Sequence, residues 1–157
     1  MPSVFLHSPN LSKFGKCNDS VLNLSLDTCR KSIDSFPYPI DFLIFTSFCP
    51  EIYTNEFHLP NRIAEGLGIK DIFCLRTETA SSSGASAFHL AARLIESGKY
   101  NSGLVVGTEV MSRLSREQSN LLLGSVLSPE QRKLSMSMAQ GGAMVATRYL
   151  QEFGYSR

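Results

Sequence analysis

The chain has 157 residues, a length that predicts one compact domain and is too short for two ordinary ones. Fifteen Lys and Arg face fourteen Asp and Glu, so we expect no basic surface and exclude nucleic acid as a partner. No apolar run reaches membrane-spanning length, and the first residues lack the basic start and long apolar core of a signal peptide. These features predict a cytoplasmic protein without a membrane span.

The four cysteines do not form a recognisable site. They are widely spaced, no CxxC pair occurs, and no histidine lies at metal-ligand spacing. The pattern therefore predicts no bound metal and no disulfide framework. We expect reduced thiols, mostly in the core, at Cys17, Cys29, Cys49 and Cys74.

The first third of the chain predicts a strand, a helix and a second strand. The apolar stretch 3–8 favours a strand that is closed by a loop. After capping residues at 18–20, apolar residues recur with helical spacing at Leu22, Leu26, Cys29 and Ile33. Prolines end this helix, and the apolar run 42–48 is typical of a strand covered on both faces.

The middle third alternates helices and strands. We expect a short helix over 59–67, with Pro60 in its first turn, and a strand over 72–78. Residues 79–92 carry no charge and are rich in Ala, Ser and Gly, which predicts a helix over 83–97. A further strand is expected over 102–107.

The last third predicts helices. Ser115 and Gln118 have capping-box spacing for a helix over 115–123. An uncharged stretch over 134–147 continues into a helix that Gly154 stops, and its Met136, Met138 and Met144 favour core packing over a soft binding surface. The adjacent Gly141 and Gly142 require that this helix start after them or that a backbone pass close by. Alternating strands and helices indicate an α/β domain with a largely parallel sheet.

The helix over 83–97 is the candidate functional element. A long uncharged helix of small residues must be enclosed on nearly every side, and its N-terminus directs unpaired N–H groups at Ser81, Ser82 and Ser83. One interpretation is that these serines cap the helix and fit a tight turn. The other is a nucleophile or anion site stabilised by the helix end. Phosphate-loop glycine motifs are absent, so a nucleotide-binding domain is the weakest alternative.

The stretch 76–111, RTETASSSGASAFHLAARLIESGKYNSGLVVGTEVM, resembles the nucleophile region of the thiolase superfamily, particularly proteins related to the thiolase part of sterol carrier protein X. In that pattern a reactive Cys lies in a run like ACASG, before AxxxAxxxIxxG and a strand resembling LVVGxExM. Residues 42–47, 61–68 and 148–157 also resemble family segments. The resemblance implies a thiolase-like sandwich half with a mixed, mostly parallel sheet and a buried small-residue helix.

The resemblance also implies site residues, a substrate and partners. Ser81 falls at the nucleophilic Cys position, and Ser82, Ser83 and Gly84 supply the helix-end or oxyanion electrostatics. The substrate class is an acyl thioester of coenzyme A in lipid metabolism, with no tightly bound cofactor. The strand 73–77 would pair across a homodimer, or the chain would meet a complementary thiolase-like subunit.

Two departures from the family pattern predict low activity. A serine hydroxyl needs a base to take its proton, whereas a thiol at a helix end is already partly ionised. The family also takes its catalytic His residues and second Cys from segments downstream of this region. We expect His7 to pack in the first strand, His58 to be a solvent-facing neighbour of a helix cap, and His89 to be an interior residue too far from Ser81 to be its base.

These observations predict that residues 1–157 form a partial thiolase-like N-terminal domain. Its function is that of an acyltransferase segment, inactive alone. The alternative is a non-catalytic assembly or binding module of a split or truncated thiolase-like protein, because the helix of a half-fold would have an uncovered apolar face. Glu78 and Glu109, at strand ends, are expected to be ion-pair or interface groups.

Overall fold

The computed structural model describes residues 3–156 and has two compact units, Met1–Arg113 and Leu114–Arg157. The single compact body expected from the chain length is therefore wrong. The first unit contains both apolar clusters of the core. Among the described residues of the second unit, only Leu122 is buried, so this unit has almost no core of its own.

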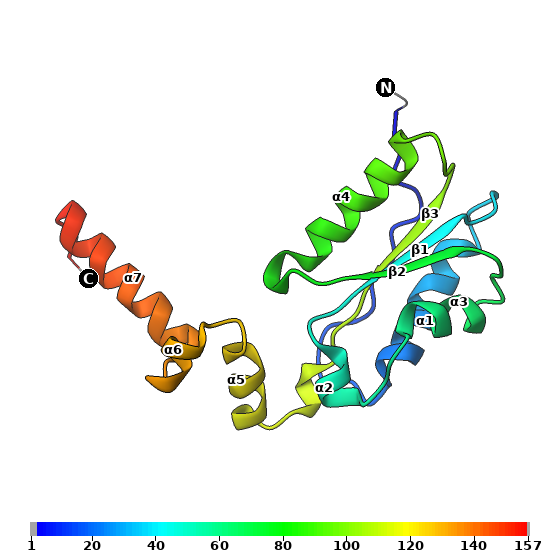
Figure 1. Ribbon diagram of the computed structural model, residues 1–157. Coiled ribbons are helices and arrows are strands. Elements are labelled where there is room, and N and C mark those ends of the chain that lie inside the picture. The colour runs from blue at the N-terminus through cyan, green and yellow to red at the C-terminus, as the bar shows by residue number, and fades with distance from the viewer. Residues whose placement is uncertain (1–2, 157) are drawn as a thin grey trace. The chain divides into compact units, whose positions relative to one another are not determined.

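A three-stranded sheet forms the centre of the first unit. β1 (Phe42–Thr46) lies between β2 (Phe73–Thr77) and β3 (Gly103–Gly107), and both pairings are parallel. Figure 1 shows α4 (Ser83–Glu96) on one face of this sheet, with α1 (Val21–Ile33) and α3 (Leu59–Gly66) on the other. The predicted α/β class is confirmed, and every strand pairing within residues 3–156 is parallel rather than mixed.

β1 is buried on both faces, as its apolar sequence predicts. Leu43 and Phe45 pack into the cluster beneath the sheet with residues of α1 and α3. Phe42 and Ile44 pack on the opposite face against Ala87 and Ala91 of α4. These two clusters fix α4 over the sheet and thereby fix where its N-terminus lies.

Local capping explains where the first helix begins. The Ser20 side chain accepts a hydrogen bond from the Asn23 N–H at 3.0 Å, which starts α1.

Sequence patterns missed α2 (Pro50–Thr54), a single short helix after β1. The residues on either side of it, Cys49 and Asn55, both have left-handed backbone conformations, and a five-residue element is too short for periodicity to identify.

The strand expected over 3–8 does not form. This segment has no strand partner within residues 3–156 and is almost wholly exposed, with Phe5 84% accessible. His7 is likewise exposed, and its ring packs edge-on against Phe36 with centroids 5.2 Å apart. An apolar stretch becomes a strand only where an edge pairs with it, and within residues 3–156 no such pairing reaches this segment.

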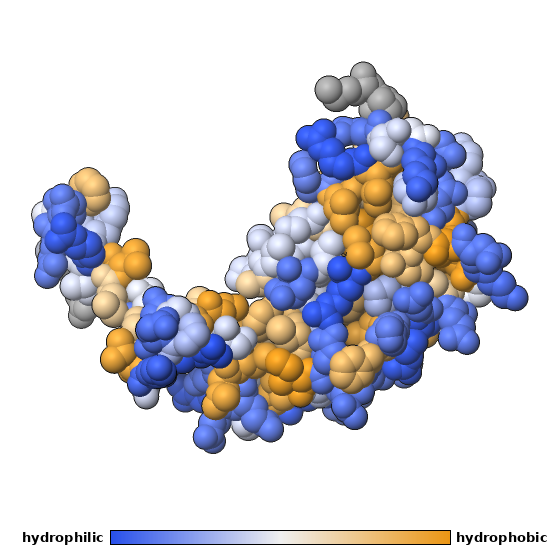
Figure 2. All heavy atoms as spheres, viewed as in Figure 1, coloured by the Kyte–Doolittle hydropathy of each residue, from blue (hydrophilic) through white to orange (hydrophobic). Residues whose placement is uncertain are grey.

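α4 is covered on one face only. Ser83, Ala87 and Ala91 are buried against the sheet, whereas Phe88 and His89 are exposed. The expected enclosure on nearly every side and the interior position of His89 are therefore wrong for this chain. The prediction of an uncovered face is confirmed, and Figure 2 shows hydrophobic side chains reaching the surface between this helix and the sheet.

The second unit consists of α5 (Arg116–Gly124), α6 (Pro129–Lys133) and α7 (Met138–Phe153). Each begins at a capping box in which a serine and a glutamine exchange hydrogen bonds with the backbone: Ser115 with Gln118, Ser128 with Gln131, and Ser137 with Gln140. The first of these was predicted; the other two carry the same signal and were missed.

Two expectations for α7 are wrong. The helix begins before Gly141 and Gly142, and a Cβ built on either glycine meets no described atom within 4 Å. The Ser137 capping box starts the helix there despite the glycines. Met138 and Met144 are exposed and Met136 is half-buried, so they do not pack in a core.

Candidate functional site

The chain turns sharply between β2 and α4. A single 3-10 turn, η1 (Ala80–Ser82), joins the two elements. Ala80 has φ +50°, a left-handed conformation that costs an L-residue about 1–2 kcal/mol. The Glu78 carboxylate accepts a hydrogen bond from the Ala80 N–H. The turn is thus strained at the residue immediately before Ser81.

Two of the three serines hold this turn together. Ser82 donates to the Thr79 carbonyl at 2.8 Å, and Ser83 accepts from the Thr79 N–H at 2.8 Å while donating to the Ala80 carbonyl at 2.7 Å. The tight-turn interpretation is confirmed for both. The capping interpretation is not confirmed, because Ser82 lies at the N-cap position of α4 and its side chain makes no hydrogen bond to the helix.

Ser81 differs from its neighbours. It is exposed, and its hydroxyl makes no hydrogen bond with residues 3–156. Gly84 is also exposed, and a Cβ built on it meets no described atom within 4 Å. The hydroxyl at the predicted nucleophile position is therefore accessible at the positive end of a 14-residue helix.

The histidines lie away from this turn. His58 is exposed at the N-cap position of α3, as predicted. His89 lies eight residues beyond Ser81 along the chain, about two helical turns along α4. His7 contacts Ser8 and Phe36 in the N-terminal segment. The roles of Ser81 and of the helix end at Ser82, Ser83 and Gly84 stay predictions.

A cavity of about 400 Å³ opens at the carboxyl end of the sheet. Its walls come from the ends of β1 and β3, the start of α4, part of α1 and the N-terminal segment around residues 10–15. Ligands of parallel α/β sheets bind outside the carboxyl ends of the strands, and this cavity reaches Ala80, Ser83 and Gly84 beside the predicted nucleophile.

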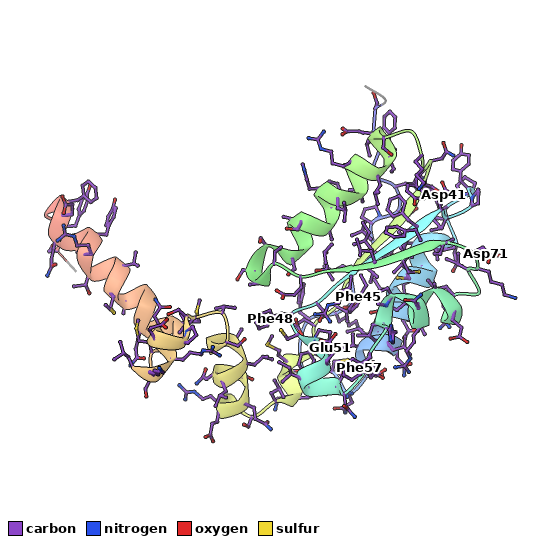
Figure 3. All side chains as sticks on the ribbon, in the orientation of Figure 1. Asp41, Phe45, Phe48, Glu51, Phe57 and Asp71 are labelled. Carbon is purple, nitrogen blue, oxygen red and sulfur yellow. The ribbon has the colours of Figure 1, made fainter. Side chains whose placement is uncertain are left out.

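Glu109 organises one wall of this cavity. Its carboxylate accepts hydrogen bonds from the Phe48 N–H at 3.1 Å and from the hydroxyls of Tyr53 and Ser47. Burial, with a further contribution from the hydrogen bond to Glu109, raises the pKa of Tyr53 above its usual range. Figure 3 shows Phe48 together with Glu51 at this end of β1.

The ion pairs expected for the two strand-end glutamates are absent from residues 3–156. Glu109 and Glu78 accept hydrogen bonds from neutral groups instead. Arg76 of β2 pairs with Glu51 of α2, and Arg62 pairs with Glu56. The glutamates are therefore structural acceptors that fix the loops after the strands.

Sequence reasoning missed Thr46 at the end of β1 and Ser47 after it, which line the cavity, and it missed Tyr53 of α2, whose hydroxyl bonds to that of Ser47. The rule that parallel strands present their carboxyl ends together would have pointed to Thr46, Ser47, Thr108 and Glu109 as neighbours. No sequence signal places Tyr53, because α2 is too short to predict.

The cysteine thiols are all free. Burial raises the pKa of Cys29 to about 12, which makes it an inert core thiol. Cys17, Cys49 and Cys74 are half-buried, and of these Cys74 packs against the apolar cluster beneath the sheet. Among the described residues, no group of three His, Cys, Asp or Glu is arranged to hold a metal ion.

The part of the chain that contains this site matches a known protein family. The model of the thiolase N-terminal domain matches residues 37–157. None of the helices within residues 3–156 is both long and apolar enough to cross a membrane. The match spans β1, β2, η1, α4 and β3, and thus every element that builds the turn at Ser81.

Two curated relatives are similar to part of this chain. Beta-ketoacyl-(acyl-carrier-protein) synthase III of Clostridium acetobutylicum is 28% identical over 100 residues, which cover 62% of this chain and 30% of the relative. The protein of the same description from Streptococcus gordonii is 29% identical over 105 residues, which cover 67% of this chain and 32% of the relative. The matches thus span about a third of the length of these relatives.

Proposed function

This chain belongs to the thiolase N-terminal domain family, and from that premise we propose that it is an acyltransferase segment that binds an acyl thioester of coenzyme A at the turn around Ser81. The reaction class would be acyl transfer in lipid metabolism. The thioester is a substrate, and we propose no tightly bound cofactor.

The observation that carries the proposal is the difference between Ser81 and its neighbours. Ser82 and Ser83 use their hydroxyls to tie the turn, whereas Ser81 is accessible and unbonded within residues 3–156. If Ser81 served only the turn, its hydroxyl would be expected to bond within the turn, as those of Ser82 and Ser83 do, rather than stay unbonded beside the strained Ala80. The start of α4 then stabilises negative charge that develops at the thioester oxygen.

We propose that turnover by this chain alone is low. A serine hydroxyl becomes a nucleophile only when a base removes its proton, and His89 lies about two helical turns away from Ser81. A thiol at the same position would not need such a base, because a helix N-terminus lowers the pKa of a cysteine.

Replacing Ser81 with a thiol tests this function directly. We expect Ser81→Cys, incubated with butyryl-coenzyme A, to gain the mass of one butyryl group that peptide mapping places on residue 81, and Ser81→Ala to gain none there. Ser82→Cys is the matched control, because its side chain is directed back at Thr79. Acylation of both cysteine variants alike, or of neither, would refute the acyl site.

A second candidate function is a non-catalytic assembly module. It is favoured by the edge of β2, where Phe73 is 42% exposed, and by the uncovered face of α4. We propose that two copies pair along β2, or that a complementary thiolase-like subunit takes the place of the second copy. A dimer in which Ser81→Cys stays unacylated would favour this function over the first.

We place the protein in the cytoplasm as part of the same proposal. The free state of all four cysteines supports a reducing compartment. Fractionation of cells that produce the tagged chain tests this location.

A further inference from the structure

Two buried hydroxyls at the end of the sheet lack hydrogen-bond partners. Thr46 ends β1, Thr77 ends β2, and their Cα atoms are paired in the sheet register. Neither Oγ1 has a partner within residues 3–156, although both oxygens are buried. Buried polar atoms without partners are rare in folded proteins, and two of them side by side indicate a shared occupant.

These hydroxyls lie beneath the start of α4. Side chains alternate along a strand, so Thr46 is on the face of Phe42 and Ile44, which pack against α4. Its register partner Thr77 is on the same face. Because α4 connects the carboxyl end of β2 to the amino end of β3, its first turn, which follows Ser81, covers this end of the sheet.

Of the two threonines, Thr46 lines the cavity, and Thr77 lies beside it in the sheet register. Thr46 is 4% exposed and lines the 400 Å³ space together with Ser83 and Gly84. Its methyl carbon Cγ2 would lie 3.2 Å from a Cβ built on Gly107 of β3, so the methyl group is directed at β3 and the hydroxyl is directed away from it. The Thr46 methyl group thus occupies the space that a side chain at Gly107 would take.

We propose that Thr46 and Thr77 are specificity-determining residues that bind a neutral oxygen, a hydroxyl or a carbonyl, on the acyl group of the ligand at Ser81. The inference rests on the proposed function and adds the chemical class of the acyl group. A carboxylate is disfavoured because Glu109 lines the same cavity with its own charge. A plain alkyl chain is disfavoured because it would leave both hydroxyls unpaired.

Two short thioesters that differ by one oxygen test the specificity. We expect the N-acetylcysteamine thioester of 3-hydroxybutyrate to bind roughly tenfold more tightly than that of butyrate, the ratio that one net hydrogen bond provides. Thr46→Val and Thr77→Val, which keep the side-chain shape, should bring the ratio of the two dissociation constants close to one. Thr28→Val is the matched control, because Thr28 lines the same cavity but its hydroxyl already donates to Leu24.

The stability of the ligand-free chain separates this role from a structural one. A hydroxyl kept for a ligand is unpaired when the site is empty, so Thr46→Val should keep or raise the unfolding temperature. A fall of several degrees would assign the hydroxyl to the fold and overturn the inference. Equal binding of both thioesters would overturn it while the acyl site stands. If neither binds, the acyl site fails and the inference fails with it.

Discussion

The Oγ of Ser25 and the Oγ1 of Thr108 lie 2.7 Å apart in the core, although 83 residues separate them in the chain. Ser25 gives its own proton to the Val21 carbonyl at 2.8 Å, so Thr108 is the donor in this pair. The bond ties α1 to the segment after β3. The bond therefore joins α1, which packs beneath the sheet, to the cavity wall that Thr108 and Glu109 form.

Removing the acceptor in this pair should destabilise the fold. Ser25→Ala leaves the Thr108 hydroxyl buried and unpaired, which should lower the free energy of unfolding by about 1–3 kcal/mol. Urea titration measures this. Adding Thr108→Val should recover part of the loss, because the orphaned donor is removed. A double variant as unstable as the sum of both single variants would show that the hydroxyls are not coupled.

The Tyr53–Glu109 bond should make stability depend on pH in alkaline solution. Burial and this hydrogen bond raise the folded-state pKa of Tyr53, while the unfolded tyrosine titrates near 10. The stabilisation is therefore fully present below about pH 10 and is lost as the pH rises toward the folded pKa.

Urea titrations from pH 8 to pH 11 check this dependence. Above about pH 10 the free energy of unfolding should fall more steeply with pH for the wild type than for Tyr53→Phe. The difference between the two slopes should be smaller than ~1.4 kcal/mol per pH unit, the limit for one fully buried group. Parallel pH profiles for the two proteins would contradict the role assigned to Tyr53. Tyr38→Phe is the matched control, since Tyr38 is exposed.

Relieving the strain before Ser81 should stabilise the chain. Ala80 has φ +50°, a conformation that glycine adopts without a steric penalty. We expect Ala80→Gly to raise the free energy of unfolding by about 0.5–1 kcal/mol. The control is Ala85→Gly, an exposed position within α4, which should lower it by a similar amount. If Ala80→Gly lowered the free energy of unfolding and Ala85→Gly raised it, Ala80 would not be strained.

The proposed pairing along β2 can be blocked through its backbone. The Phe73 N–H donates to Asp41 at the base of β1, so by alternation the N–H groups of Cys74 and Arg76 are directed at the free edge. Cys74→Pro removes one outward donor without taking a hydrogen bond from β1. We expect native mass spectrometry to show a dimer for Cys74→Ala and a monomer for Cys74→Pro. A dimer in both would place the contact elsewhere.

Local sequence signals predicted most elements of the fold. The apolar run of β1, the helical spacing of α1 and the capping box at Ser115 all lie within a few residues, so their effect does not depend on distant contacts. The stretch 3–8 has the same apolar character as a strand, yet it has no pairing partner within residues 3–156. Strand formation depends on an edge elsewhere in the chain, which local sequence does not report.

By itself, the sequence determined that an uncharged, small-residue helix follows a strand through three serines, because residue type alone sets helix tendency, charge and the resemblance to a nucleophile turn. The tertiary structure decided which hydroxyls are used. Ser82 and Ser83 bind the turn, Ser81 is free, and Thr46 is brought beside Thr77 from 31 positions away. Hydrogen bonds form between groups that meet in space, and only the folded sheet and helix bring these groups together.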